Sequence, residues 1–256
     1  MNIDFAGTRV LVTGGTRGIG RATVEAFLEG GARVAINGRT AESVARAISG
    51  LAAPDRIEAV PGDIGNVGDC QHVVETAITR LGGLDILVNS AGASEGGLIE
   101  ETTPEQWERI INVNLRGTFL CIKHAVRALR ASRGNVVNVA SILGLAGKGL
   151  GTSAYCASKG GVVNLTRDLA AELGPHIRVN CLCPGAIDTD MLRGYGMMLG
   201  HGKVSAGYQI LRDSASLGRL AQAAEMASII LFLASDHASF VTGSILVGDG
   251  GFISKI

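Results

Sequence analysis

The sequence predicts an α/β fold: a doubly wound parallel sheet of about seven strands with helices on both faces. Short, nearly continuous apolar runs rich in Val and Ile are typical of strands that are buried on both sides. These runs alternate with longer segments of helical periodicity, the order that produces right-handed crossovers between parallel strands. No repeat or low-complexity linker interrupts the 256 residues, so we expect a single domain spanning residues 1–256.

The elements are expected in a regular order along the chain. Strands are predicted at residues 9–13, 33–37, 57–60, 85–89, 135–140, 178–182 and 244–247. Helices are predicted at residues 19–29, 41–50, 67–81, 104–130, 154–173 and 222–234. Residues 191–209 depart from this order because five glycines interrupt a stretch that contains Met and Tyr. A surface loop would explain them, but we favour a mobile substrate lid around residues 190–215.

Composition limits the classes of partner. Apolar residues make up 46% of the chain, charged residues 18%, and the formal charges sum to zero. This balance is typical of a folded globular chain and gives no indication of nucleic acid or a membrane as a partner. The N-terminal segment lacks the pattern of a signal peptide, and five cysteines without regular spacing indicate a reducing compartment, so we expect the cytoplasm. The five histidines show no metal-ligand spacing, so no metal is expected.

A glycine-rich turn follows the first strand and leads into a helix. Glycines allow a sharp turn and a close approach of the backbone to a pyrophosphate, which the free N–H groups of a helix N-terminus can bind. The spacing is G-x-x-x-G-x-G rather than the usual G-x-G-x-x-G, and a tight loop alone would also explain it. The cofactor contacts expected from this turn are Thr13, Gly14, Thr16, Arg17, Gly18, Ile19 and Gly20.

The end of the second strand bears on the choice of cofactor. A carboxylate there would bind the ribose 2′-hydroxyl of NAD and repel the 2′-phosphate of NADP. The chain instead has Asn37-Gly38-Arg39, and no acid precedes Glu42. Arg39, helped by Arg17, offers a planar cation for a phosphate, although a solvated surface arginine would look the same. NADP(H) is therefore favoured over NAD(H).

Other turns at the carboxyl ends of strands add expected cofactor contacts. Asp63 is placed to accept a hydrogen bond from an adenine amino group, and Asn89 ends the strand beside the switch point of the sheet. Each of these segments would also be explained as an ordinary turn. The further contacts expected are Asn37, Asp63, Ile64, Asn89, Ala91 and Gly92.

Tyr155 and Lys159 are one helical turn apart and share a helix face. A phenol is too weak an acid or base at neutral pH unless nearby positive charge lowers its pKa, as a lysine ammonium and an oxidised nicotinamide would. Such a pair is common by itself, so its context decides. Ser141 follows a strand, where its hydroxyl can stabilise charge on a substrate oxygen, and Asn114 lies within a helical pattern that disfavours Asn.

Together these motifs, in this order, resemble the classical short-chain dehydrogenase/reductase family over essentially the whole chain, which implies a Rossmann-like fold. The resemblance implies that Tyr155 is the catalytic acid and base. It implies that Lys159 holds the nicotinamide ribose and tunes Tyr155, and that Ser141 orients the substrate. It further implies that Asn114 supports a water that links Lys159 to solvent.

The resemblance also extends to the strand end at residue 184 and includes two departures. Contacts to the nicotinamide carboxamide and the phosphates are implied for Pro184, Gly185, Ile187 and Thr189. Ser90 stands where many members carry Asn. The interval from Ser141 to Tyr155 is about one residue longer than usual, so residues 148–153 are expected to differ in shape.

The expected substrate is a small ketone or the matching secondary alcohol. Segments 93–99, 142–152 and 186–209 are candidates for an apolar pocket because they carry several Leu and Met residues. The main alternative is a 3-oxoacyl-[acyl-carrier-protein] reductase, for which Arg127, Arg130 and Arg133 would form a basic rim. A sugar or polyol dehydrogenase and a non-catalytic NADP-sensing protein on the same fold remain open.

Self-association is also expected. The adjacent Gly160 and Gly161 in a predicted helix indicate that another helix approaches closely, since each glycine costs a helix roughly 1 kcal/mol relative to alanine. The family resemblance implies a homodimer or homotetramer that forms through the helices around residues 105–130 and 154–173.

Overall fold

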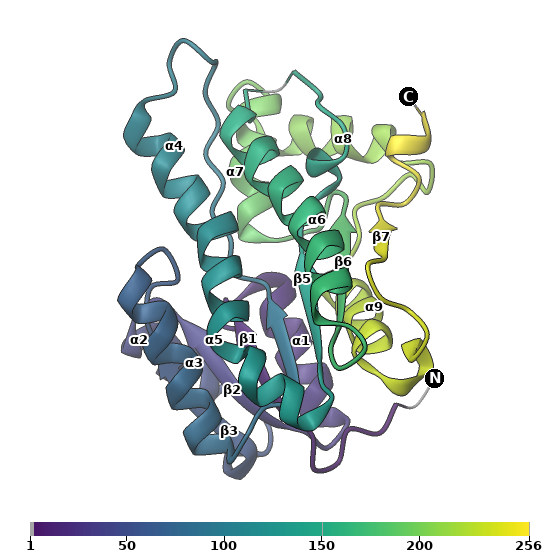
Figure 1. Cartoon of the computed structure of the whole chain (residues 1–256). Helices are drawn as coiled ribbons and strands as arrows, with labels where there is room; N and C mark the ends of the chain where they lie inside the picture. The colour runs from purple at the N-terminus through teal and green to yellow at the C-terminus, as the bar shows by residue number, and fades with distance from the viewer. Residues whose placement is uncertain (1–2, 150, 256) are drawn as a thin grey trace.

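The computed structural model describes residues 3–149 and 151–255, and Figure 1 shows how their elements are arranged. Leu150, in the candidate pocket segment 142–152, lies outside the described residues, as do residues 1, 2 and 256. One parallel sheet has the strand order β3-β2-β1-β4-β5-β6-β7. Its strands are β1 (Arg9–Thr13), β2 (Arg33–Gly38), β3 (Ile57–Pro61), β4 (Ile86–Asn89), β5 (Asn135–Val139), β6 (Arg178–Pro184) and β7 (Ile245–Gly248). All seven predicted strands are confirmed.

The strand order reverses between β1 and β4, which creates a switch point at the carboxyl edge of the sheet. The helices are α1 (Gly18–Glu29), α2 (Ala41–Ser49), α3 (Val67–Leu81), α4 (Pro104–Ile111), α5 (Gly117–Ser132), α6 (Ser153–Leu173), α7 (Asp190–Leu199), α8 (Val204–Ser214) and α9 (Ala223–Ala234). Local signals fix several starts. Thr103, for example, accepts a hydrogen bond from the backbone N–H of Gln106 at 3.2 Å and caps α4.

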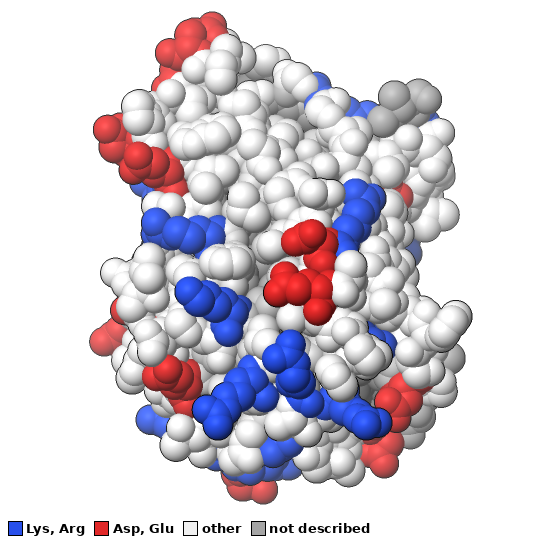
Figure 2. Space-filling view, in the orientation of Figure 1, with Lys and Arg blue, Asp and Glu red and all other residues white. Residues whose placement is uncertain are grey.

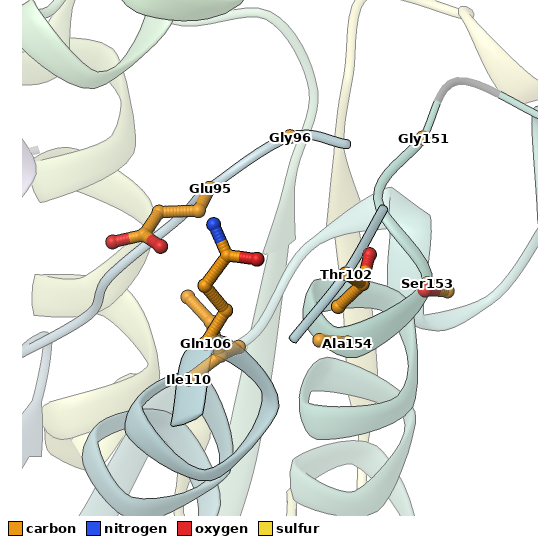
Figure 3. Close-up of a pocket in the computed structure, with 8 residues that line it drawn as sticks. All are labelled: Glu95, Gly96, Thr102, Gln106, Ile110, Gly151, Ser153 and Ala154. Atoms are coloured by element: carbon orange, nitrogen blue, oxygen red, sulfur yellow. The ribbon is translucent and has the colours of Figure 1, made fainter. Parts of the chain in front are cut away.

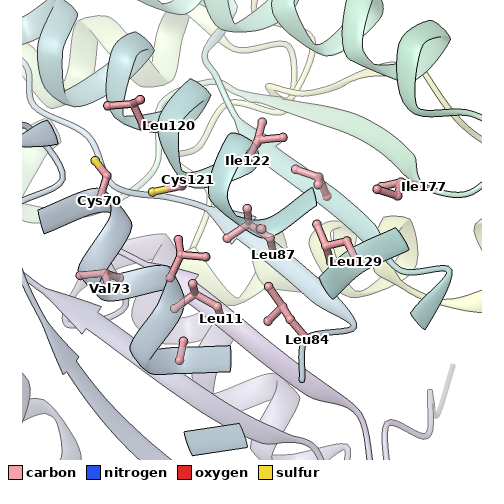
Figure 4. Packing of buried hydrophobic residues seen from close by; sticks show 14 of the residues in the cluster. Leu11, Cys70, Val73, Leu84, Leu87, Leu120, Cys121, Ile122, Leu129 and Ile177 are labelled. Carbon is pink, nitrogen blue, oxygen red and sulfur yellow. The ribbon is translucent and has the colours of Figure 1, made fainter. Parts of the chain in front are cut away.

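Both faces of the sheet are buried. Successive residues of β1 point to opposite cores, because side chains alternate along a strand. Val10 and Val12 pack in the cluster formed with α1 and α9, whereas Leu11 packs in the cluster formed with α3, α5 and the end of α6. Figure 4 shows the second cluster, in which Leu11 and Leu87 of the sheet lie close to Val73 of α3. This double coverage explains why the strands read as continuous apolar runs.

The helix predicted over residues 104–130 is not uniform. Between α4 and α5 lies a π-helical segment, η2 (Asn112–Arg116), which widens the helix at Asn114. Gly117 follows directly, and a side chain there would overlap with Ile64. Gly161 of α6 likewise approaches η2, since a Cβ there would lie 2.7 Å from the Leu115 side chain. The glycine pair predicted a close approach by another helix. At Gly161 this approach is a contact with η2 of the same chain.

No helix was predicted for residues 191–209, and the substrate lid expected there stays a prediction. Their glycines do not break the segment into a loop, because α7 and α8 are regular helices. Gly196 and Gly207 lie where these helices meet. A side chain at Gly207 would overlap with the Gly196 carbonyl, and a Cβ on Gly196 would lie 2.8 Å from the Tyr208 ring. The glycines permit tight packing, which outweighs their poor helix propensity.

Within residues 3–149 and 151–255, no helix combines the length and the apolar character that crossing a bilayer requires. No three His, Cys, Asp or Glu side chains gather there in a way that could hold a metal ion.

Candidate active site

The glycine-rich turn lies at the switch point, pressed against the end of β4. Gly14 has a φ of +66°, and a Cβ there would lie 2.7 Å from the Cα of Ala91. The backbone N–H of Ala91 donates to the hydroxyl of Thr13 at 3.2 Å. The turn after β1 and the turn after β4 therefore form one rigid floor at this edge of the sheet.

Asn37 fastens this floor to the second and third strands. Its Oδ1 accepts from the backbone N–H of Gly14 at 3.3 Å, and its Nδ2 donates to the carbonyls of Val60 and Gly62, each at 3.0 Å. The side chain is buried, and both of its polar atoms are used within the protein. Asn37 thus positions the turn, while a direct contact with a cofactor stays a prediction.

The start of α1 has the features that a pyrophosphate needs. The N-cap residue Arg17 makes no side-chain capping bond, so the first N–H groups remain available, with the positive end of the helix dipole beside them. Gly18 has a φ of +55°, and a Cβ there would lie 3.4 Å from Thr189. Arg17 and Arg39 are exposed, and neither makes an ion pair with any residue the structure describes. These residues fit a nicotinamide dinucleotide, including one with a 2′-phosphate.

Asp63 borders a cleft of about 590 Å³ between the turn at residues 63–67 and the helices α4 and η2. Its Oδ1 accepts from the backbone N–H of Gly65 at 2.8 Å, which fixes the turn. The side chain of Ile64 is buried in the core near Gly117, so a contact between Ile64 and a nucleotide would involve its main chain. The adenine contact expected of Asp63 stays a prediction.

Ser141, Tyr155 and Lys159 come together where β5 ends against α6. Lys159 is buried, its Nζ donates to the carbonyl of Val139 at 2.8 Å, and this atom lies 5.8 Å from the centre of the Tyr155 ring. Ser141 precedes the short helix η3 (Ile142–Gly144), and its Oγ accepts from the backbone N–H of Leu143 at 3.1 Å. The three side chains therefore lie close together at the carboxyl edge of the sheet.

Gly144 determines how closely η3 packs against α6. A Cβ on Gly144 would lie 2.6 Å from the backbone carbon of Lys159 and 2.8 Å from the nitrogen of Gly160. Real Cβ atoms do not approach a backbone so closely, so η3 can pack directly on α6 only with glycine at this position. This contact brings Ser141 toward Tyr155.

Burial dominates the pKa values of the two titrating groups. It raises the pKa of Tyr155 to about 12, against the opposing effect of the hydrogen bond with Ser141. It lowers the pKa of Lys159 to about 8, against the opposing effect of the thiols of Cys181 and Cys183. The effect expected of Lys159 and of an oxidised nicotinamide on the pKa of this phenol stays a prediction.

Asn114 lies in the π-helical segment, where its side chain joins three parts of the site. Its Oδ1 accepts from the backbone N–H of Ala93 at 2.8 Å, and its Nδ2 donates to the carbonyl of Ala93 and to Ser158 Oγ, at 2.9 and 3.0 Å. It thereby ties the turn after β4 to α6, one residue before Lys159. Its role toward a water stays a prediction.

The turn after β6 completes the rim opposite the glycine-rich turn. The backbone N–H of Gly185, next to Pro184, donates to the carbonyl of Gly248 at 3.0 Å, and Ile187 pairs with Ala221 through a parallel bridge. These bonds hold Thr189 beside Gly18. The turn after β6 thus meets the glycine-rich turn at Thr189, while the cofactor contacts expected of Pro184, Gly185, Ile187 and Thr189 stay predictions.

A small hollow lies behind the loop at residues 93–103 (Figure 3). It is lined by Glu95, Gly96, Thr102, Gln106, Ile110, Gly151, Ser153 and Ala154. Its volume is about 10 Å³, close to the space of one water molecule, so it is too small for an organic substrate. Across this region the backbone N–H of Gly97 donates to the carbonyl of Gly151 at 2.8 Å and fixes the loop beside the start of α6.

The arginines expected to form a basic rim are on the wrong side of the molecule. Arg127 and Arg130 lie in the second half of α5, and Arg133 directly follows this helix, two residues before the start of β5. The reacting groups lie past the other end of that strand. In Figure 2 the Lys and Arg side chains gather on the lower part of the view, toward which α5 descends in Figure 1. A helix that packs antiparallel to its strand carries its last residues away from the carboxyl edge.

Sequence reasoning missed the side chain of Tyr195 on α7. Its hydroxyl is buried, and none of the described residues forms a hydrogen bond with it. Met191, Tyr195 and Met198 follow the spacing of one helix face. This spacing was visible in the sequence, but the glycines between the three residues obscured it.

Comparisons with known proteins agree with this architecture. A family model described as enoyl-(acyl carrier protein) reductase matches residues 14–253. The 2,5-dichloro-2,5-cyclohexadiene-1,4-diol dehydrogenase of Sphingobium indicum is 39% identical over 257 residues, covering 97% of this chain and 98% of the relative. The meso-2,3-butanediol dehydrogenase of Serratia marcescens is 35% identical over 247 residues, covering 94% and 93%.

A solved structure shows the same fold. The short-chain dehydrogenase/reductase described as glucose/ribitol dehydrogenase from Brucella melitensis superposes with a TM-score of 0.90 at 33% identity, covering 98% of this chain and 99% of the other. Fold and relatives together define an oxidoreductase that acts on CH–OH groups and uses NAD or NADP. The chain belongs to the short-chain dehydrogenase/reductase family.

Proposed function

We propose that the chain interconverts a small ketone and its secondary alcohol with NADP(H), using Tyr155 as acid and base. The observation that carries this proposal is the packing of Ser141, Tyr155 and Lys159 close to one another at the carboxyl edge of the sheet. The glycine-rich turn lies at the same edge. In this proposal the whole chain acts as one nucleotide-binding domain, and α7 and α8 cover the substrate.

Each side chain has a separate task in the proposed reaction. In reduction the Tyr155 hydroxyl donates its proton to the substrate oxygen, while the Ser141 hydroxyl hydrogen-bonds to the same oxygen and stabilises its developing charge. In oxidation Tyr155 accepts the proton of the alcohol. Lys159, with a pKa of about 8, is mainly protonated at neutral pH and stabilises the phenolate. The bound nicotinamide supplies or accepts the hydride.

Replacement of the phenol tests the mechanism. With NADPH and a panel of ketones, Tyr155→Phe is expected to lower turnover by about 10²- to 10⁴-fold, because the proton donor is lost. The affinity for NADPH, measured by fluorescence titration, is expected to stay close to that of the unmodified protein. Tyr208→Phe is the matched control, since the Tyr208 hydroxyl lies on α8 and donates to Asp188. Turnover that survives in Tyr155→Phe would refute the role of Tyr155, and NADPH binding without turnover of any ketone would favour the sensor alternative.

The preference for NADP(H) rests on Arg39 and Arg17 and on the absence of an acid at the end of β2. Arg39→Asp is expected to weaken NADPH binding by about 10- to 100-fold, the cost of losing a charge-assisted hydrogen bond and adding repulsion. NADH binding is expected to change little. Arg46→Asp makes the same charge change at an exposed position on α2 and serves as the control. Equal losses for both cofactors in Arg39→Asp would contradict the assignment.

The choice among substrates follows from the surroundings of the crevice. The misplaced arginines remove the basic rim that an acidic carrier protein would need, so the carrier-protein reductase receives less support than a small-molecule dehydrogenase. The curated relatives described above are both named for alcohols, which supports a secondary alcohol as substrate. We also propose a cytoplasmic location, supported by cysteines that are free and mostly buried.

Self-association through α4, α5 and α6 is part of the proposal. Trp107 on α4 and Phe119 on α5 are 42% and 43% exposed, unusual for large apolar side chains without a partner. Figure 2 shows a broad uncharged area on the face that carries these helices in Figure 1. Sedimentation of the purified chain distinguishes the expected dimer or tetramer from a monomer.

A further inference from the structure

One face of α7 extends from the neighbourhood of Gly92 and Lys159 at one end to Gly96 at the other. Met191, Tyr195 and Met198 occupy this face, since residues four and three apart lie on the same side of a helix. The Cε of Met191 would lie 3.9 Å from a Cβ on Gly92, and the Nζ of Lys159 would lie 3.7 Å from the same Cβ. At the other end, the Met198 sulfur lies against Gly96. Tyr195 therefore projects into the middle of this span.

The Tyr195 hydroxyl is buried, yet it has no hydrogen-bond partner among residues 3–149 and 151–255. Burial and, to a lesser extent, the nearby Cys156 thiol raise the pKa of Tyr195 to about 12, so the hydroxyl remains a donor at neutral pH. Cys156 directly follows Tyr155 on α6. The phenol of Tyr195 on α7 thus lies near Cys156, at the start of α6.

An unpaired buried hydroxyl lowers the stability of the fold, because its bonds to water are lost and not replaced. Phenylalanine would fill the same space without this cost. A tyrosine at this position therefore calls for an explanation other than stability. The explanation that fits the location is a hydrogen bond to a bound substrate.

We propose that Tyr195 determines specificity by hydrogen-bonding to a second oxygen of the substrate, so that the preferred substrates are small, largely apolar diols and hydroxyketones. This inference rests on the proposed function. The oxygen at the reacting carbon already has Tyr155 and Ser141, which leaves Tyr195 for another one. A phenol both donates and accepts, so it suits a hydroxyl or a carbonyl.

The rest of this α7 face argues for an uncharged substrate body. Met191 and Met198 offer thioether and methylene surface, which suits hydrocarbon. A carboxylate or phosphate at this place would need a cation beside it. Lys148, in the loop before α6, lies over the ring of Phe252 with its Nζ 5.0 Å from the ring centre, and Lys159 donates to the carbonyl of Val139. A neutral molecule with two oxygens therefore fits this face better than an acid.

Paired substrates test the inference. We would measure kcat/KM with NADP⁺ for the three positional isomers of cyclohexanediol and for cyclohexanol, which lacks the second oxygen. The unmodified protein is expected to prefer at least one diol over cyclohexanol. Tyr195→Phe is expected to lose about 10- to 100-fold on that diol and less than about 3-fold on cyclohexanol, the pattern of one lost buried hydrogen bond. Tyr208→Phe on the neighbouring helix is expected to keep the preference.

Two other measurements separate this role from a structural one. The melting temperature of Tyr195→Phe is expected to equal or exceed that of the unmodified protein, because the unpaired hydroxyl is removed. Calorimetric titration of the same compounds into protein saturated with NADP⁺ is expected to show weaker diol binding in Tyr195→Phe and unchanged cyclohexanol binding. This binding assay tests Tyr195 even if none of the compounds is turned over.

Several outcomes would overturn the inference. These are an unmodified protein that binds no diol better than cyclohexanol, equal losses on both kinds of compound in Tyr195→Phe, and a marked fall in its melting temperature. Tyr155→Phe separates this failure from failure of the proposed function. If Tyr155→Phe retains turnover, the proposed mechanism is wrong. If Tyr155→Phe loses turnover but Tyr195→Phe keeps the diol preference, only the present inference is refuted.

Discussion

Lys159 illustrates how burial and charge compete at a single residue. Its ammonium is almost fully buried and has one protein acceptor, the carbonyl of Val139, so the protein disfavours the charged form and lowers its pKa to about 8. The group nevertheless keeps its proton at neutral pH. This combination provides a positive charge beside Tyr155 at the expense of the stability of the fold.

The lowered pKa predicts a pH dependence of stability. Between about pH 8 and pH 10 the unfolded chain binds a proton at Lys159 that the folded chain does not. The free energy of unfolding contributed by this residue therefore rises with pH in this window, by up to about 1.4 kcal/mol per pH unit. The measurement is denaturant unfolding of the unmodified protein and of Lys159→Met. As the pH rises from about 8 to about 10, the free energy of unfolding of the unmodified protein should increase relative to that of Lys159→Met. A difference that stays constant from pH 8 to pH 10 would contradict the lowered pKa.

Residue identities in the site were largely predictable, whereas their environments were not. Ser141, Tyr155 and Lys159 come together because each lies at a place fixed by strand and helix periodicity. The raised pKa of Tyr155 was not foreseen, because desolvation depends on side chains from distant elements. The bonds of Asn37 to Gly14, Val60 and Gly62 were hidden for the same reason, since a sequence does not reveal which polar atoms meet in the interior.

At the scale of elements, the contact between η3 and α6 sets the distance from Ser141 to the tyrosine-bearing helix. Gly144→Ala is expected to lower the free energy of unfolding by about 1–3 kcal/mol, because the new methyl group overlaps with the backbone of Lys159 and Gly160. Turnover should also fall, since η3 moves and carries Ser141 with it. Chemical denaturation and steady-state kinetics measure the two effects.

Gly147→Ala is the control for this contact. Gly147 lies three residues further along the same loop, and a Cβ there meets nothing within 4 Å. We expect its stability to stay within about 0.5 kcal/mol of the unmodified protein and its turnover to be unchanged. If the two alanine variants behave alike, the packing of η3 on α6 does not position Ser141.

The irregular elements were harder to predict than the regular ones. The π-helical segment at Asn114 depends on side-chain bonds to Ala93 and Ser158, which come from other parts of the chain. The low helix propensity of the glycines in α7 and α8 indicated a loop. They prove to be contact points between two helices, and contacts of this kind leave little periodic signal in a sequence.

For the molecule as a whole, the strand pattern was enough to predict the architecture. Each strand of a parallel sheet is buried on both faces, so it reads as a short apolar run, and the helix between two such runs fixes their relative direction. The proposed assembly of copies depends on surfaces that no periodicity describes. The exposed side chains of Trp107 and Phe119 became evident only when the helix faces were known.

The bonds between the turn after β6 and the last part of the chain affect how the protein is made. Gly185 and Ile187 are held by Gly248 and Ala221, so the turn after β6 depends on segments that a ribosome synthesises after it. Until β7 emerges, β6 has an unpaired edge, a template on which another nascent chain can add a strand. The turn after β6 therefore gains these contacts only once residues 221–248 have been synthesised, and removal of β7 would leave Gly185 without its bond to Gly248.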